Sequence, residues 1–213
     1  MLALLALPVS FHLNLPRQRS AEVTCSATTL TALHLNQPCR PRPRQRTAEV
    51  VCSATTLTAL DATIEPRSCM GTWYVQRQIP ALALLEGGAR NGVERYEWDD
   101  ATSSFSVCYT FNRRGKADED VTTVRQRGWV ASEQGTQWQV APLLGGFCPP
   151  VRLPFVILDV DPAAGMVCSG GLDSWMYVLT REKRPDGALV DALLATAAAT
   201  GIDMAKVSTV EHT

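Results

Sequence analysis

The stretch that decides the fold is SCMGTWYVQRQIP, residues 68–80. Gly71 and a small residue precede a Trp-Tyr pair, an alternating run follows, and Pro80 ends it. Such alternation predicts a β-strand over 71–79, because successive side chains of a strand point to opposite faces. The chain contains no Trp or Tyr before Trp73. We therefore expect the folded domain to begin close to this strand.

Composition divides the chain into two parts. It has 213 residues, of which 46% are hydrophobic and 19% charged, which is typical of one soluble domain with a tail. Residues 1–60 hold six Arg and two Glu, a net charge of +4, whereas residues 61–213 hold 14 basic and 19 acidic residues, a net charge of −5. We therefore expect a tail over 1–60 and a domain over 61–213. The domain's acidic balance, without a basic stripe, argues against nucleic-acid binding.

The tail repeats itself. PRQRSAEVTCSATTLTAL at 16–33 returns at 43–60 with 16 of 18 positions identical, and a solenoid needs at least about three copies. A composition rich in Ser, Thr and Arg is typical of transit peptides, and behind the short apolar run at 1–7 it resembles the two-part leader of algae with secondary plastids. We expect a targeting leader, cleaved between about residues 52 and 68, and a plastid location, the thylakoid lumen included. The alternatives are a disordered tail and a secreted or endomembrane-lumen protein.

Seven further alternating or apolar runs follow the first strand, each bounded by Gly, Pro, Asp or Ser. They are 93–99, 105–113, 122–132, 136–143, 153–161, 165–170 and 174–182. Eight short strands at hairpin spacing favour an antiparallel barrel or sandwich. One stretch predicts a helix: Asp186 can cap it, Leu189, Leu193 and Leu194 share one face, and Gly201 ends it. A last short strand is expected after the helix.

This order of elements resembles the lipocalins, above all the bacterial-lipocalin and apolipoprotein D branch with its plant temperature-induced and chloroplast members. The matching pieces are GTWYVQRQIP at 71–80, WMYVLTRE at 175–182 and DALLATAAATGIDMAKV at 191–207. The resemblance covers about residues 66–210 and implies an all-β fold, an eight-stranded antiparallel up-and-down barrel with one C-terminal helix. One departure is LDVDPAAG at 158–165, which lacks the Tyr of the family's second signature.

The resemblance gives the opening motif a structural role. A barrel of eight strands becomes a cup only if one end is plugged, and Trp73 fills that end. Arg181 of the last strand is expected to lie across the indole face, and Gly71 to permit close backbone approach. These three residues are thus expected to close the barrel and not to bind ligand.

Alternation along each strand then predicts the ligand site. If Trp73 points inward, Val75 and Arg77 do too, and Arg181 sets the parity of the last strand. We expect Trp98 and Trp175 at the mouth. The alternative is that these side chains simply fill the barrel as a core. The predicted ligand-binding residues are Tyr96, Trp98, Val107, Tyr109, Phe111, Phe155, Trp175 and Tyr177.

Four of the seven cysteines lie in the domain: Cys69, Cys108, Cys148 and Cys168. They are candidates for disulfides, and in relatives a bridge often ties the segment before the first strand to the sheet, which points to Cys69 with Cys168 or Cys148. Cys108 faces outward by parity, and the orientation of Cys168 is open. No Cys/His ligand spacing supports a metal, and we expect no cofactor.

Three candidate functions remain. The resemblance implies a carrier that holds a small hydrophobic ligand, such as a lipid, fatty acid, sterol or carotenoid, with peripheral membrane association and a role in membrane-lipid protection or stress response as further expectations. The alternatives are a lipocalin-fold enzyme acting on a lipid or xanthophyll, which needs an activated thiolate inside the cup, and a structural partner of a membrane complex. We expect no catalytic residue, because all three His lie outside the barrel segments.

Overall fold

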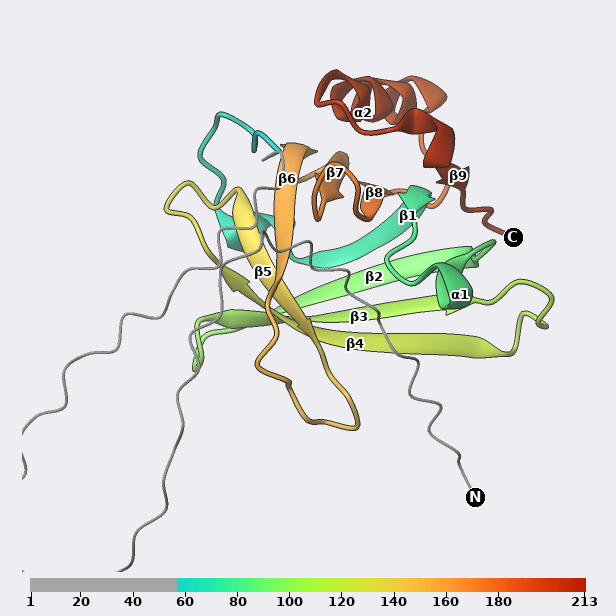
Figure 1. Cartoon of the computed structure of the whole chain (residues 1–213), viewed down its shortest axis with the longest axis horizontal. Coiled ribbons are helices and arrows are strands. Elements are labelled where there is room, and N and C mark those ends of the chain that lie inside the picture. Colours follow the sequence, from blue (N-terminus) through green and yellow to red (C-terminus); the bar gives the residue numbers. More distant parts are fainter. Residues whose placement is uncertain (1–56) are drawn as a thin grey trace, which may run out of the picture. The chain divides into compact units, whose positions relative to one another are not determined.

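The computed structural model describes residues 57–213. Eight antiparallel strands are hydrogen-bonded in sequence order, and β1 pairs with both β8 and β2, so the sheet closes into a barrel (Figure 1). This confirms the predicted up-and-down barrel. The strands are β1 Gly71–Ile79, β2 Arg90–Asp99, β3 Ser104–Asn112, β4 Val121–Val130, β5 Gln137–Pro142, β6 Leu153–Asp161, β7 Gly165–Ser169 and β8 Met176–Thr180.

Antiparallel pairing gives the barrel two ends. The closed end is the one at which β1 begins, together with the turns that join β2 to β3, β4 to β5 and β6 to β7. The other end is the mouth. It carries the connections 80–89, 113–120, 143–152 and 170–175, and the short helix α1, Ala83–Glu86, lies in the first of them.

A β-bulge in β1 overturns one predicted side-chain direction. The register with β8 shifts between Val75 and Arg77, so that Val75 pairs with Leu179 but Arg77 pairs with Val178. Val75 is buried in the barrel core as predicted, whereas Arg77 lies on the outside, where its guanidinium donates to the Gln76 carbonyl. The prediction that Arg77 points inward is therefore wrong, because one extra residue in a strand reverses the alternation that follows it.

Helix α2, Gly187–Ala199, packs on the outside of the barrel across β6, β7 and β8 (Figure 1). Asp186 caps it, its carboxylate accepting from the Ala188 amide at 3.0 Å. The buried face is formed by Val190, Leu193 and Ala197; of the predicted face, only Leu193 is fully buried, and Leu189 and Leu194 are half-buried.

The chain then forms the 3₁₀ turn η2, Met204–Lys206, and the short strand β9, Ser208–Thr209, which pairs with β1 as the predicted last strand. Within residues 57–213, neither α-helix has the length and apolar content needed to cross a bilayer.

The segment before β1 belongs to the packed structure. Leu57 is buried against the helix side of the barrel, the Leu60 amide donates to the Ile157 carbonyl at 2.9 Å, and Ile64 joins the barrel core. The 3₁₀ turn η1, Pro66–Cys69, leads into β1. Packing thus extends four residues into the segment 1–60, whose other residues, including the first repeat copy, lie outside the described part of the chain.

Candidate functional site

The closed end of the barrel is built around Trp73 and Arg181. The Arg181 guanidinium lies 3.5 Å from the centroid of the fully buried Trp73 ring, and the Trp73 indole donates to the Cys69 carbonyl at 2.8 Å. Arg181 also donates to the carbonyls of Thr72 and Pro162, and to those of the turn before β1. One side chain thus joins the start of β1 to the β6–β7 turn and covers the indole.

Gly71 is required by this arrangement. Its φ of +98° is a conformation that side chains disfavour, and a Cβ there would lie 3.3 Å from Arg181 Nη1. The glycine of the opening motif therefore leaves room for the cation that covers the tryptophan.

A small cavity lies inside the barrel toward the mouth. Its free volume is about 40 Å³. Five of the predicted ligand-binding residues line it: Tyr96, Tyr109, Phe155, Trp175 and Tyr177. Their rings form a connected wall, with centroid distances of 6.0 Å from Tyr109 to Tyr177, 5.4 Å from Tyr177 to Trp175 and 5.3 Å from Trp175 to Phe155.

Three predicted ligand-binding residues do not line this cavity. Val107 and Phe111 are buried in the barrel core, where Phe111 stacks on Tyr109 at 4.7 Å. Trp98 lies at the closed end, beyond the Gly71–Tyr96 pair of the register, with the Arg67 guanidinium 5.2 Å from its ring centroid. The prediction of Trp98 at the mouth is wrong, because β2 runs from the mouth toward the closed end; Trp175 does lie at the mouth.

The interior also contains a tryptophan that the sequence analysis did not assign to the site. Trp138 of β5 is buried, stacks on Phe155 at 5.1 Å and meets Phe105 edge-on at 4.9 Å. The Phe105 ring in turn covers Gly128, where a Cβ would lie 2.2 Å from it. These large rings leave little free space, so the half of the barrel next to the closed end is a packed core.

Two buried carboxyl groups face the same cavity, and both were missed from sequence. Glu86 of α1 accepts from the Tyr177 hydroxyl at 2.5 Å and from the Ala81 amide at 3.2 Å. Glu94 of β2 accepts a short hydrogen bond from the Tyr96 hydroxyl. Glu94 was detectable, since it precedes Tyr96 by two residues and therefore shares its inward face. Nothing in the sequence marks Glu86 as buried.

Burial dominates the electrostatics of this cavity. Desolvation raises the pKa of Glu94 to about 7, although the Tyr96 hydrogen bond acts in the opposite direction. Desolvation also raises the pKa of Glu86, again against the hydrogen bond from Tyr177. The pKa values of Tyr96, Tyr109 and Tyr177 are raised by burial and by the neighbouring carboxyls. The tyrosines therefore stay protonated and act as hydrogen-bond donors.

Comparison with known families agrees with this architecture. A family model for the lipocalin-like domain matches residues 64–212, most of the chain. The chain belongs to the lipocalin family. A sequence search of curated proteins finds no match.

Solved structures share the lipocalin fold at low identity. Insecticyanin from the tobacco hornworm Manduca sexta is 16% identical, with a TM-score of 0.59 over 75% of this chain and 86% of that one. Lobster apocrustacyanin A1 is 11% identical, with a TM-score of 0.53 over 73% and 89%. The siderocalin Ex-FABP, described as functioning through dual ligand specificities, is 13% identical, with a TM-score of 0.50 over 68% and 94%. These similarities concern the fold.

The four cysteines of the lipocalin domain are free thiols in the structure, so the expected bridge from Cys69 is not formed. Cys69 and Cys168 are both buried, and Cys168 belongs to the barrel core, which settles its orientation as inward. Burial and the nearby Glu94 carboxyl raise the pKa of Cys168 well above its usual value. A thiol in this environment resists ionisation, whereas catalysis by cysteine requires a thiolate.

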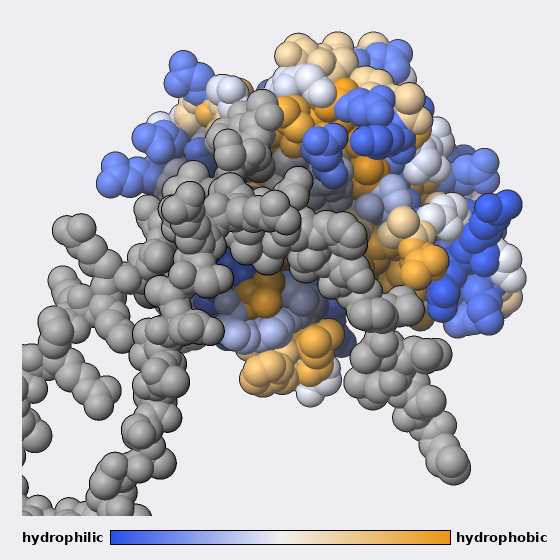
Figure 2. Space-filling model, in the orientation of Figure 1, coloured by the Kyte–Doolittle hydropathy of each residue, from blue (hydrophilic) through white to orange (hydrophobic). Residues whose placement is uncertain are grey.

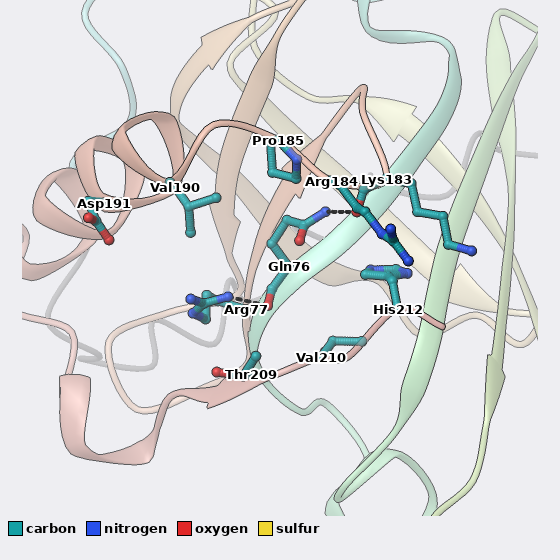
Figure 3. A pocket seen from close by; sticks show the side chains of 11 residues that line it. Gln76, Arg77, Lys183, Arg184, Pro185, Val190, Asp191, Thr209, Val210 and His212 are labelled. Atoms are coloured by element: carbon teal, nitrogen blue, oxygen red, sulfur yellow. Dashed lines mark hydrogen bonds between the residues drawn. The ribbon is translucent and has the colours of Figure 1, made fainter.

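A separate hollow of about 300 Å³ lies outside the lipocalin barrel, between β1, the loop before α2 and the C-terminal segment (Figure 3). Its cations are Arg77, Lys183 and Arg184, and the Gln76 amide donates across it to the carbonyls of the loop. None of the predicted ligand-binding residues lines this hollow. The predicted site is therefore the cavity inside the barrel.

Proposed function

We propose that this lipocalin is a carrier that binds a small hydrophobic ligand inside its barrel. The observation that carries the proposal is the cavity at the mouth end of a closed barrel, whose walls combine aromatic rings with a few convergent polar groups. This combination is typical of small-molecule sites. Family membership supports the same function.

The present cavity of about 40 Å³ is far smaller than the roughly 300–1,000 Å³ of small-molecule pockets. Binding therefore requires the cavity to widen. Two of its lining side chains, Trp175 and Leu153, must move, and so must the connection that carries α1. That connection is held to side chains of the barrel wall by three hydrogen bonds: from the Tyr177 hydroxyl to the Glu86 carboxylate, from the Gln78 amide to the Glu86 carbonyl and from the Ala81 amide to the Tyr177 hydroxyl. This helix has four residues and its Leu84 side chain is exposed, and a short surface element of this kind is suited to act as a lid.

All of the exposed large hydrophobic side chains within residues 57–213 lie at the mouth, and none of them lies at the closed end. They are Leu82, Leu84, Val121, Leu144, Phe147, Val151 and Leu153. Figure 2 shows apolar side chains at the lower edge of the molecule, on the loop between β5 and β6. Exposed apolar groups around a ligand entrance support peripheral membrane association. Co-sedimentation with vesicles, lost in a Leu84→Asp/Phe147→Asp variant, tests this.

A carrier is preferred to an enzyme. The thiol inside the barrel, Cys168, has a raised pKa and so lacks the thiolate character that a cysteine nucleophile needs. The histidine of the described domain, His212, lies outside the barrel, where its ring contacts the Val75 carbonyl at 2.8 Å. We therefore assign no catalytic residue. The alternative of a structural partner of a membrane complex would use the outer surface and leave the cavity without a role.

We further propose a plastid location, on the composition of residues 1–60. Since Leu57 and Leu60 pack against the domain, we expect cleavage before residue 57, inside the window of about 52 to 68. N-terminal sequencing of the protein from its native source tests this, and a mature protein that begins at Met1 would overturn it.

The carrier proposal is tested by native extraction and mass spectrometry of small molecules that co-purify. A stoichiometric hydrophobic compound, lost from a folded Val140→Phe variant whose larger side chain fills the cavity, is the expected result. Protein recovered without any such compound, and unable to take one up, would contradict the proposal.

A further inference from the structure

The cavity has an unusual charge balance for a site that holds a fatty acid. Two of its lining side chains, Glu86 and Glu94, are carboxyls, both nearly excluded from solvent. Within residues 57–213, no Arg, Lys or His lines the cavity. The remaining polar lining groups are the hydroxyls of Tyr96, Tyr109 and Tyr177 and the amide of Gln126.

The two carboxyls come from different parts of the fold and meet at this one space. Glu94 stands on the barrel wall, opposite Trp73 in the β1–β2 register and opposite Tyr109 in the β2–β3 register. Glu86 enters from the α1 connection above the mouth. Both line the same cavity, and the Glu86 carboxyl disfavours ionisation of Glu94. A buried pair of like charges is costly unless a positive charge lies between or beside them.

A carboxylate ligand would add a third negative charge to this enclosed space. A protonated amine would neutralise it, and its N–H groups would donate to the carboxylate oxygens, the strongest type of hydrogen bond in proteins. The aromatic rings of Phe155, Trp175 and Tyr177 line the same cavity, and aromatic rings can add cation–π contact to an ammonium group. The cavity of about 40 Å³ has room for a head group the size of about three water molecules.

We propose that the ligand of this barrel is an organic cation, an amine with an apolar tail, whose ammonium head lies between Glu86 and Glu94. The inference rests on the proposed carrier function and names the chemical class of its ligand. Because Glu86 belongs to the lid and Glu94 to the wall, the ammonium group joins the two and closes the lid over the head group. The tail extends past Leu153 and Trp175 toward the mouth.

The proposal predicts a pH dependence of binding. The titratable groups that face Glu94 are Glu86 from the α1 connection, Tyr96 from its own strand, Tyr109 from β3, Cys168 from β7 and Tyr177 from β8. All are acids, so none of them supplies a positive charge. A cation binds best when Glu94 is ionised; affinity for an amine therefore falls as the pH drops through about 7.

The test compares three probes with one alkyl chain: octylammonium, octan-1-ol and octanoate. Binding to the full domain is followed by calorimetry and by tryptophan emission at about pH 8, where the amine is still protonated. Octylammonium is expected to bind at least about tenfold more tightly than octanoate. This preference should shrink about tenfold or more at about pH 5.5, because Glu94 is then protonated.

Two variants assign the effect to the cavity. Glu94→Gln keeps the shape and the acceptor for Tyr96 but removes the charge, and Glu86→Gln does the same on the lid; each should reduce the preference for octylammonium. Glu97→Gln is the matched control, since Glu97 lies on the outer face of the same strand, paired with Arg95 at 2.8 Å. It should leave the preference unchanged.

The outcomes separate the two proposals. If octanoate binds as tightly as octylammonium, or if folded Glu94→Gln and Glu86→Gln variants keep the full preference, the ligand class is wrong and the carrier function stands. If none of the three probes binds, the carrier function is contradicted as well.

Discussion

Trp73 and Arg181 illustrate how single residues set the ends of this barrel. The guanidinium covers the indole at 3.5 Å and bonds to backbone carbonyls on both sides of the closed end. The resemblance of the opening motif was sufficient to pair these two residues. The alternation of residues in β1 was insufficient to predict the direction of the Arg77 side chain, because it does not reveal the bulge at Gln76. Glu86 was also out of reach, since its burial depends on the fold of a loop.

The Trp73 plug is a testable contribution to stability. Trp73→Ala should lower the free energy of unfolding by about 3–5 kcal/mol, because it leaves a large void under Arg181. Urea unfolding measures the loss. Trp129→Ala is the control, since Trp129 lies on the outer surface against Arg152. Equal losses for the two variants would contradict the structural role of Trp73.

Buried Glu94 predicts that the unliganded protein loses stability as pH rises. Its pKa is about 7 in the folded state against an ordinary value of 4.5, so the folded state holds the proton more tightly than the unfolded chain. Stability should fall by about 3 kcal/mol from pH 4.5 to pH 7 and then stay level. Urea unfolding at several pH values measures this. Glu94→Gln should remove most of the fall, and an unchanged pH profile in that variant would contradict the account.

At the level of elements, the strands could be predicted from the sequence, whereas helix α1 and the buried face of helix α2 could not. Eight alternating or apolar runs between turn residues gave all barrel strands within a few residues, because alternation reflects a wall with two different faces. Helix α1 has four residues and no side-chain cap, so no sequence signal marks it. Helix α2 was found by its cap, but its apolar residues occur on all sides, which left the choice of buried face to the contact with the barrel.

The face of α2 that packs on the barrel can be tested with two adjacent leucines. Leu193 is 4% exposed and lies against Gly165 of β7, where a Cβ would lie 2.8 Å from its Cδ1, whereas Leu194 is half-buried. Leu193→Ala should cost about 2–5 kcal/mol of unfolding free energy and Leu194→Ala clearly less. Thermal and urea unfolding of both variants measure the difference. A larger cost at Leu194 would mean that the helix is rotated from the described position.

For the whole molecule, the two barrel ends have different characters. The closed end holds the packed core of Trp73, Phe105 and Trp138, and the mouth end holds the cavity, the lid and the exposed apolar loops. Parity in the sequence placed most of the aromatic residues inside, but it could not divide them between core and cavity. That division depends on strand direction and stagger, which a single strand's pattern does not contain.

This division predicts which tryptophan reports ligand entry. Trp175 lines the cavity and Trp98 lies at the opposite end. A ligand should therefore quench or shift tryptophan emission in the wild type and in Trp98→Phe, but the change should be largely lost in Trp175→Phe. Emission titrations with octylammonium measure this. A signal that disappears with Trp98 instead would place the ligand at the closed end.

The central claim, that the barrel interior binds a hydrophobic ligand, is tested most directly by a chain-length series. Primary amines and primary alcohols from butyl to dodecyl are titrated into the domain by calorimetry. Each buried CH₂ contributes about 0.8 kcal/mol, so affinity should rise about fourfold per carbon and then level off when the chain reaches the end of the space that the lid opens. Affinity that stays flat across both series would show that the interior is only a packed core.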